Sequence, residues 1–217
     1  MEFAILDFIQ ENFRSGILDT VMTFITGLGD SGKIWIACTF LLLLIPKTRK
    51  AGTAMGIALV LEIICCNIIL KPFVARIRPC DVNTAVQLLI ERPLDYSFPS
   101  GHTASSLAAA SALYFSRKKL WIPAVILAGL ISFSRLYLYV HYPTDVLAGA
   151  LLGIMIGWIG SILANILADK LYAHGFTAMW ADKRRTSYDR FLYSIYHVRF
   201  LLRSIQQNAP VTRFFGL

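Results

Sequence analysis

The chain has 217 residues, of which 56% are hydrophobic and 16% charged, with a mean hydropathy of +0.60 and a formal net charge of +8. Soluble domains carry about 25% charged residues, and a soluble domain of this size would leave too much apolar surface exposed. The same numbers exclude a disordered chain, a collagen-like fibre and a nucleic-acid-binding arm. Because the apolar residues form blocks long enough to cross a bilayer, we expect an integral membrane protein.

The first 30 residues carry two short apolar patterns. Residues 2–14 alternate apolar and charged side chains at helical spacing, which predicts an amphipathic helix in the membrane interface. Residues 17–28 are mostly apolar but would span only about 18 Å as a helix, which is too short to cross alone. We therefore expect a half-inserted or tilted helix that ends near Gly27–Gly29, so that 1–30 form an N-terminal unit on the outer face.

Longer apolar segments follow and define the body of the protein. They cover residues 32–46, 51–70, 101–116, 120–139 and 144–172. Residues 101–116 are rich in Ala and Ser, which is typical of a helix packed inside a bundle. The pattern predicts an all-α, polytopic transmembrane helix bundle of five to six spans, occupying residues 31–172.

The basic residues predict the orientation of this bundle. Lys and Arg gather in 47–50, in 117–119 and in the tail 173–217, and alternating crossings place all three groups on one side. The positive-inside rule makes that side cytoplasmic, so the C-terminus would be cytoplasmic and the N-terminus outside. The tail interleaves Arg with aromatic residues; it would be a basic amphipathic helix on the inner leaflet, or else a partner-binding or oligomerisation helix.

Two polar motifs on the expected outer side point to an anion. Lys71, Arg76 and Arg78 lie within eight positions on the side that should be poor in positive charge. The next segment opens with Ser100 and Gly101, where Ser can cap a helix and Gly lets a ligand approach the backbone. Free N–H groups at a helix start favour a bound phosphate.

A third polar motif carries a candidate nucleophile. His141 and Asp145 are four residues apart, so they would share a face if the helix starts by residue 142. Asp145 could then accept a hydrogen bond from one ring nitrogen of His141 and leave the other nitrogen free to attack. Counting crossings places this motif, Lys71 and His102 at the same membrane level.

The three motifs together resemble the signature of the type 2 phosphatidic acid phosphatase superfamily of membrane lipid phosphatases. Residues 71–79 fit K-x6-R-P, residues 99–102 read P-S-G-H, and residues 134–145 fit S-R-x5-H-x3-D. Each motif alone is weakly specific, whereas the ordered set is highly specific. The resemblance covers residues 71–145 and extends loosely to the surrounding spans, but not to the tail.

The resemblance implies a role for each signature residue. Lys71, Arg78 and Arg135 would hold the phosphate, together with Ser100 and the N–H groups around Gly101. His141 would attack phosphorus and form a phosphohistidine. Asp145 would orient His141, and His102 would protonate the leaving oxygen and later activate water. No metal and no cofactor are expected, because side chains supply the positive charge.

Four further residues are expected to support the site. They are Glu62, Asn67, Arg76 and Ser134. Asn67 lies one helical turn before Lys71 and could brace it. Glu62 lies deep in a span, where ionisable groups are costly; it would make a structural hydrogen bond, or else line the lipid pocket or couple to a proton.

The sequence thus predicts an enzyme of the cell membrane that acts on a lipid phosphate at the outer face. For a bacterial source, undecaprenyl pyrophosphate is the favoured substrate, and phosphatidylglycerol phosphate or phosphatidic acid is the alternative. The alternative to an enzyme is a protein of another functional class on the same scaffold, either a catalytically silent lipid-binding protein or a transporter. Membrane lipids are the expected partners, nucleic acid is not, and the oligomeric state stays open.

Overall fold

The computed structural model describes residues 1–173, and within them the chain forms helices joined by turns and loops. The α-helices are α1 (Glu2–Phe13), α2 (Gly16–Gly29), α3 (Lys33–Leu44), α4 (Arg49–Glu62), α5 (Lys71–Val74), α6 (Pro79–Val82), α7 (Gly101–Phe115), α8 (Trp121–Tyr137) and α9 (Pro143–Ala173). A 3-10 turn joins α2 to α3, and a π-helical segment (Ile63–Leu70) joins α4 to α5. The predicted all-helical bundle is confirmed.

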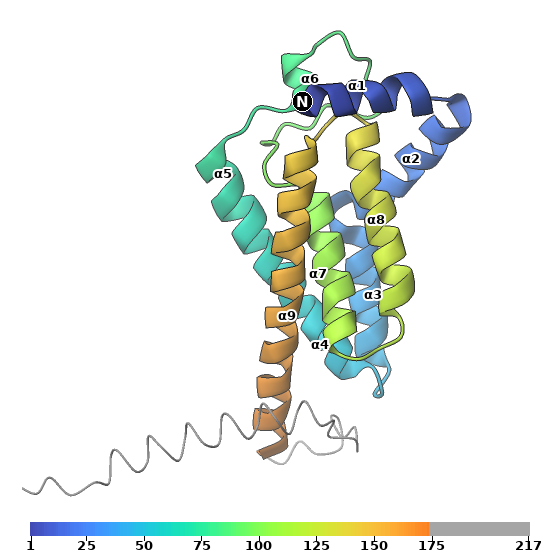
Figure 1. Cartoon of the computed structure of the whole chain (residues 1–217). Helices are drawn as coiled ribbons and strands as arrows, with labels where there is room; N and C mark the ends of the chain where they lie inside the picture. The colour runs from blue at the N-terminus through green and yellow to red at the C-terminus, as the bar shows by residue number, and fades with distance from the viewer. Residues whose placement is uncertain (174–217) are drawn as a thin grey trace, which may run out of the picture. The chain divides into compact units, whose positions relative to one another are not determined.

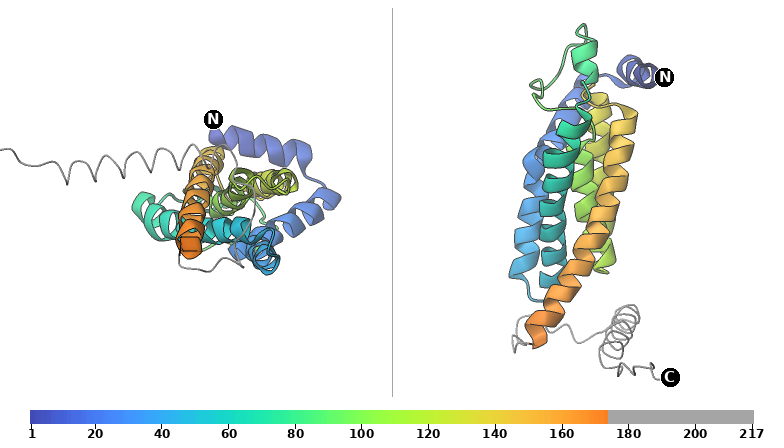
Figure 2. Two further views of the ribbon diagram at one scale, coloured as in Figure 1. Left: turned by 90° about the horizontal axis from the view of Figure 1, so that it is seen from below. Right: turned by 90° about the vertical axis from the view of Figure 1, so that its left-hand side faces the viewer.

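Helix α7 is the centre of the bundle (Figures 1 and 2). It packs against α4, α8 and α9, and its residues Ala104, Ala108 and Ala112 are completely buried. Small side chains let neighbouring helices approach closely. The prediction that the Ala- and Ser-rich segment lies inside the bundle is therefore confirmed.

Glycines of α9 make the closest of these contacts. A Cβ at Gly149 would lie 2.6 Å from the backbone oxygen of Ser100, and one at Gly157 would lie 2.6 Å from that of Ala108. Gly153, between them, meets the α7 backbone in the same way. The glycine stripe at every fourth position thus packs within the chain, behind the motifs of the α7 and α9 N-termini.

Within residues 1–173, three helical stretches are long and apolar enough to cross a membrane. They are Gly16–Leu44, Arg49–Val82 and Pro143–Leu171, and the shorter helix α8 is also apolar. As predicted, α2 ends at Gly29. It does not form a crossing of its own, because α3 continues after a short turn and the two together make up one candidate span.

The helix that carries Lys71 departs from the prediction at its end. The sequence predicts a helical segment over residues 51–70 with Lys71 at its end, but the helix continues to Val74. It stops where Ala75 adopts a left-handed backbone with φ of 50°, a conformation that costs energy for a residue with a Cβ. Lys71 therefore lies within the helix, whereas Arg76 and Arg78 lie in the extended segment after it.

Helix α1 lies across the end of α8 and α9 (Figure 1). Its Leu6 and Ile9 are buried there. Two hydrogen bonds hold it in place: the hydroxyl of Tyr139 donates to Asp7 (2.7 Å), and Gln10 donates to the carbonyl of Tyr137 (2.6 Å). The predicted amphipathic helix thus covers the end of the bundle at which the polar motifs lie.

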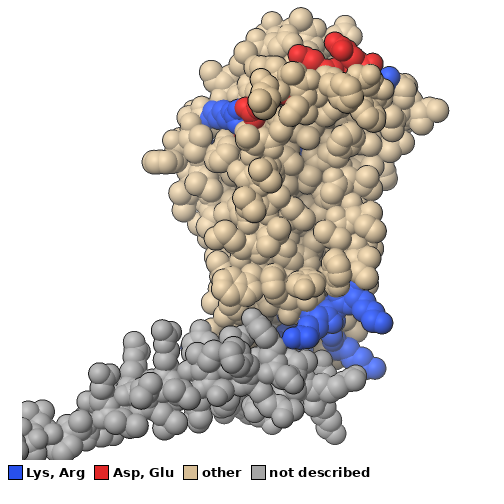
Figure 3. Space-filling view, in the orientation of Figure 1, with Lys and Arg blue, Asp and Glu red and all other residues tan. Residues whose placement is uncertain are grey.

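Charged side chains gather at the two ends of the bundle, with an uncharged band between them on the face seen in Figure 3. The turns that hold 47–50 and 117–119 meet at the end opposite α1, where Lys118 donates to the carbonyl of Lys47 (2.7 Å). The predicted tail, apart from residue 173, lies outside the described residues.

Candidate active site

The three motifs converge at the end of the bundle that α1 covers. The first follows α5, the second forms the start of α7, and the third runs from the end of α8 into α9. Most of their functional side chains are buried, with exposed fractions of 6% for Lys71, 2% for Arg78 and 3% for Arg135. Charged groups this deeply buried require partners, and the partners define the site.

His141 lies in the turn between α8 and α9. Tyr139, two residues earlier, has a left-handed backbone with φ of 60°, and this turn directs the imidazole into the protein, where it is 1% exposed. The Nε2 atom of His141 lies 3.1 Å from Nη1 of Arg78. The nitrogen that would attack phosphorus is therefore next to a guanidinium that could bind the same phosphate.

The pKa of His141 lies well below its usual value of 6.5. Burial is the main cause, and the positive charges of Arg78, Arg135 and Lys71 act in the same direction. A lowered pKa keeps the imidazole neutral at pH 7. Neutral imidazole is the form that has a lone pair for attack.

Asp145 is completely buried and accepts hydrogen bonds from three groups. Its Oδ2 accepts from the hydroxyl of Ser97 (2.5 Å) and from the backbone N–H of Tyr142 (2.9 Å), and its Oδ1 accepts from Arg76 (2.6 Å). Asp145 is the third residue of α9 and bonds back to the residue before the helix, as in a capping box. Three hydrogen bonds thus hold the carboxylate beside His141.

The expected hydrogen bond between Asp145 and His141 is not formed. The carboxylate Oδ2 lies 3.6 Å from Nδ1 of His141, and within residues 1–173 this nitrogen has no hydrogen-bond partner. The cause is the helix start: α9 begins at Pro143, so His141 precedes the helix and does not stack above Asp145. The gap is small, and catalytic contacts often tighten when substrate binds.

Lys71 and Arg78 bind a carboxylate that the sequence analysis did not single out as a site residue. Asp95 accepts from Lys71 through Oδ2 and from Nη2 of Arg78 through Oδ1 (2.6 Å). Burial alone would raise the pKa of Asp95, but the hydrogen bond from Lys71 and the charges of Lys71 and Arg78 lower it to about 2. Asp95 is therefore an anion across the physiological pH range.

Arg135 reaches the site from the end of α8. Its Nη1 donates to the hydroxyl of Thr26 in α2 (2.5 Å), whereas its Nε has no partner among the described residues. A buried guanidinium with an unused donor is suited to receive an anion. Ser134, in contrast, bonds back to the carbonyl of Ile131 within its own helix (2.6 Å), so it braces α8 and does not enter the site.

The start of α7 is fixed from two sides. The N–H of Ser100 donates to the backbone oxygen of Asp145 (3.1 Å), and the Ser100 hydroxyl accepts from Thr103 (3.0 Å). A Cβ at Gly101 would lie 3.1 Å from the side-chain oxygen of Asn67 and 3.8 Å from that of Glu62. A larger residue at position 101 would require the Asn67 side chain to shift by a few tenths of an ångström.

Asn67 and Glu62 therefore contact Gly101, and the expected bond from Asn67 to Lys71 is not among the described contacts. Glu62 is 3% exposed, and one of its oxygens lacks a hydrogen-bond partner within residues 1–173.

His102 pairs with an acid from the N-terminal unit. Its Nε2 lies 3.0 Å from Oδ1 of Asp30, in the turn between α2 and α3. The side chain of His102 is 20% exposed and that of Asp30 is 49% exposed, so the pair lies at the mouth of the site, where protons can exchange with water. The charge of Asp30 favours the protonated imidazole that a general acid requires, but burial and the charge of Arg135 outweigh it and lower the pKa of His102 to about 4.

Five partners of the site were missed by the sequence analysis. They are Glu2, Thr26, Asp30, Asp95 and Ser97. Ser97 lies just before the second motif and Asp95 just before Ser97, so closeness in sequence was a usable signal for these two. The other three come from the first 30 residues, and no spacing links them to residues 71–145.

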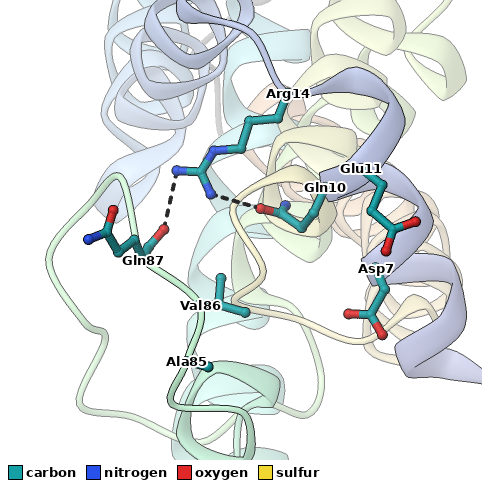
Figure 4. A pocket seen from close by; sticks show the side chains of 7 residues that line it. All are labelled: Asp7, Gln10, Glu11, Arg14, Ala85, Val86 and Gln87. Atoms are coloured by element: carbon teal, nitrogen blue, oxygen red, sulfur yellow. Dashed lines mark hydrogen bonds between the residues drawn. The ribbon is translucent and has the colours of Figure 1, made fainter.

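An open groove lies apart from these motifs, between α1 and the loop after α6 (Figure 4). Its volume is about 450 Å³. Its lining residues are Asp7, Gln10, Glu11, Arg14, Ala85, Val86 and Gln87. It contains none of the motif residues. Within residues 1–173, no group of three or more His, Cys, Asp or Glu side chains could hold a metal ion.

The structure gathers buried Lys, Arg, His and Asp side chains at one end of a helical membrane bundle, as a membrane phosphatase requires for binding and attacking a phosphate. The comparison with known families agrees: residues 49–167 match the model of the PAP2 superfamily. The chain is a member of this superfamily and a phosphatase.

The chain is similar to three named phosphatases. The chain is 39% identical to an undecaprenyl-diphosphatase of Sulfolobus acidocaldarius, over 69% of this chain and 70% of that protein. It is 32% identical to the undecaprenyl-diphosphatase BcrC of Bacillus subtilis, over 71% and 79%. The crystal structure of a PAP2-type phosphatidylglycerolphosphate phosphatase from B. subtilis superposes with a TM-score of 0.60 at 27% identity, covering 77% of this chain and 84% of that one.

Proposed function

We propose that the protein removes the terminal phosphate of undecaprenyl pyrophosphate at the outer face of the cell membrane. The proposal rests foremost on the 3.1 Å contact between His141 Nε2 and Arg78 Nη1, because it pairs a nucleophile with a phosphate-binding group in a buried site. The choice of lipid is supported by the two undecaprenyl-diphosphatases among the relatives.

The first chemical step would be attack of His141 Nε2 on the terminal phosphorus. The new P–N bond forms as the P–O bond to the lipid phosphate breaks, and His102 gives its proton to the leaving oxygen. Lys71, Arg78 and Arg135 would neutralise the charge on the oxygens of the transferred group. Asp145 would stabilise the positive imidazole ring that results.

The second step would release phosphate. His102, now neutral, takes a proton from a water molecule as that water attacks phosphorus, and the P–N bond breaks. Orthophosphate leaves, His141 is again neutral and His102 again carries its proton. All of the positive charge in this scheme comes from side chains, so activity should persist in EDTA; metal independence stays a prediction until that measurement is made.

The orientation is proposed from the charges. The turns at 47–50 and 117–119 carry the basic residues at the end opposite the site, and the positive-inside rule assigns that end to the cytoplasm. A membrane-impermeant maleimide tests this in intact cells. It should label Leu94→Cys, whose parent side chain is fully exposed at the site end, and should not label Lys119→Cys. The reverse pattern would place the site inside the cell.

The activity is tested with purified protein in detergent and EDTA. We expect phosphate release from undecaprenyl pyrophosphate, inhibition by vanadate, and an acid-labile, alkali-stable phosphoenzyme that is absent from His141→Ala. Release that survives His141→Ala would overturn the nucleophile. Phosphatidylglycerol phosphate and phosphatidic acid are run in parallel, because the B. subtilis structural relative is a phosphatidylglycerolphosphate phosphatase. A higher kcat/KM on either of them would replace the proposed substrate.

A further inference from the structure

Asp95 occupies the position where an anion is expected. Its two carboxylate oxygens accept hydrogen bonds from Lys71 and from Nη2 of Arg78, the two cations of the K-x6-R-P motif. A carboxylate and a phosphate present oxygens of similar spacing to such donors. The two cations assigned to the substrate phosphate thus already hold an anion that belongs to the chain.

The burial of the three side chains shows which of them can move. Lys71 is 8% and Arg78 is 2% exposed at the side chain, whereas Asp95 is 52% exposed. The cations are enclosed by the protein, and their carboxylate partner lies on the solvent side. An anion arriving from the membrane surface would meet Asp95 before it meets Lys71 or Arg78.

The backbone around Asp95 is held by hydrogen bonds that do not involve its carboxylate. The Nε of Arg78 donates to the backbone oxygen of Asp95 (2.8 Å), a contact that does not involve the carboxylate. Two residues later, the Ser97 N–H donates to the backbone oxygen of Arg76 (2.8 Å). Rotation about the Cα–Cβ bond of Asp95 would therefore free Lys71 and one arm of Arg78 without moving the loop.

We propose that Asp95 is a built-in competitor for the phosphate site, whose carboxylate must rotate away before a phosphoryl group can bind Lys71 and Arg78. Because it is tethered beside the site, it acts at a high effective concentration. It would weaken binding of every phosphate ligand and speed the release of orthophosphate, which has no lipid tail to retain it. The inference rests on the proposed role of Lys71 and Arg78 in binding phosphate.

The first test compares Asp95→Asn with the wild-type full-length enzyme. The amide keeps the size of the side chain and removes the charge that competes. We expect the inhibition constants of orthophosphate and vanadate to fall on the order of tenfold, and KM for undecaprenyl pyrophosphate to fall with them. The control is Asp81→Asn: Asp81 pairs with Arg92 (3.1 Å) outside the site, so its removal should leave these constants unchanged. Unchanged or higher inhibition constants in Asp95→Asn would overturn the inference.

The second test does not depend on turnover. Orthophosphate should raise the melting temperature of His141→Ala in detergent, and it should do so at about tenfold lower concentration once Asp95→Asn is added. Asp95→Ser serves the same purpose if the Asn variant does not fold. Asp95→Glu keeps a competing carboxylate and should behave like the wild type. If orthophosphate binds weakly to both the Asn and the Ser variant, Asp95 organises Lys71 and Arg78 for phosphate binding and does not compete with it, and the inference is overturned.

A parallel variant separates this inference from the proposed function. If Lys71→Ala leaves the inhibition constant of orthophosphate unchanged, the phosphate is not bound where we place it, and the proposed function fails. If Lys71→Ala weakens orthophosphate binding while Asp95→Asn does not tighten it, the proposed function stands and the competitor is rejected.

Discussion

Arg76 and Asp145 form a salt bridge of 2.6 Å in which the carboxylate is completely buried and the guanidinium is 28% exposed. The other arm of Arg76 binds Glu2 of α1 (2.5 Å), and Glu2 also accepts from Thr144 (2.5 Å). Arg76 thus connects the N-terminal helix to the carboxylate beside His141. The sequence predicts only a supporting role for Arg76, and the structure places it in direct contact with Asp145, Glu2 and Thr144.

Asp145→Asn should lower kcat by about 10²- to 10⁴-fold, by analogy with the Asp-to-Asn change in serine protease triads. An amide cannot balance Arg76 and the developing positive charge on His141 together. Asp169→Asn, in an exposed position near the other end of α9, is the matched control and should leave kcat unchanged. Steady-state kinetics on undecaprenyl pyrophosphate provides the measurement; a loss below tenfold for Asp145→Asn would contradict its orienting role.

Arg76→Gln should lower kcat by up to about 10²-fold through misplacement of Asp145, while KM changes little. Arg76→Lys should recover part of the loss because it keeps the charge, and Glu2→Gln should cost less than either because it removes only the link to α1. A rise in KM at constant kcat would show that Arg76 binds substrate and does not position Asp145.

His102→Ala should be most harmful with poor leaving groups. A general acid contributes about 10²- to 10⁴-fold when the leaving oxygen needs a proton, so hydrolysis of lipid phosphates should fall by that factor. With p-nitrophenyl phosphate the first step, measured as the burst of nitrophenolate, should slow by less than about tenfold, because nitrophenolate leaves without a proton; the second step still needs His102 as the base. Asp30→Asn should show the same selectivity with smaller losses. Equal losses on both kinds of substrate would assign His102 another role.

The pH profile of kcat/KM should be bell-shaped, because His141 must be neutral and His102 protonated. Burial and the charges of Arg78, Arg135 and Lys71 lower the pKa of His141, so His141 stays neutral below pH 6.5 and the acid limb should lie below that value. Arg135→Gln removes one of these charges and should shift the acid limb to higher pH. A shift to lower pH, or a flat profile, would count against the assignment.

Gly153→Ala should destabilise the bundle by about 1–3 kcal/mol. A Cβ at this position would overlap the backbone oxygen of Ala104 and lie 3.0 Å from the N atom of Ala108. Gly129→Ala in α8 is the control, because its Cβ would meet nothing within 4 Å and alanine favours the helix. Melting temperatures in detergent should fall for the first and stay or rise for the second; equal effects would show that the α7–α9 contact is looser than described.

Local patterns in the sequence were sufficient for the helices and the motifs. Apolar segments long enough to span a bilayer predicted the bundle, and the small residues of 101–116 predicted its central helix. Two predictions about where helices begin and end were wrong. The helix through Lys71 runs on to Val74, and α9 starts too late for His141 to stack on Asp145. Such boundaries depend on caps and backbone strain that apolar periodicity does not encode.

The sequence by itself determined the class of fold, the membrane setting and the family, because hydrophobic periodicity and motif order are properties of short stretches of chain. Only the tertiary structure decided which acid accompanies which base. His102 meets Asp30 across 72 positions of sequence, and Arg135 meets Thr26 across 109. Spacing cannot predict such pairs, since they form only when helices pack and buried charges must find partners. Asp95 shows the same principle: it lies close to the second motif in sequence, but only packing shows that it pairs with Lys71 and Arg78.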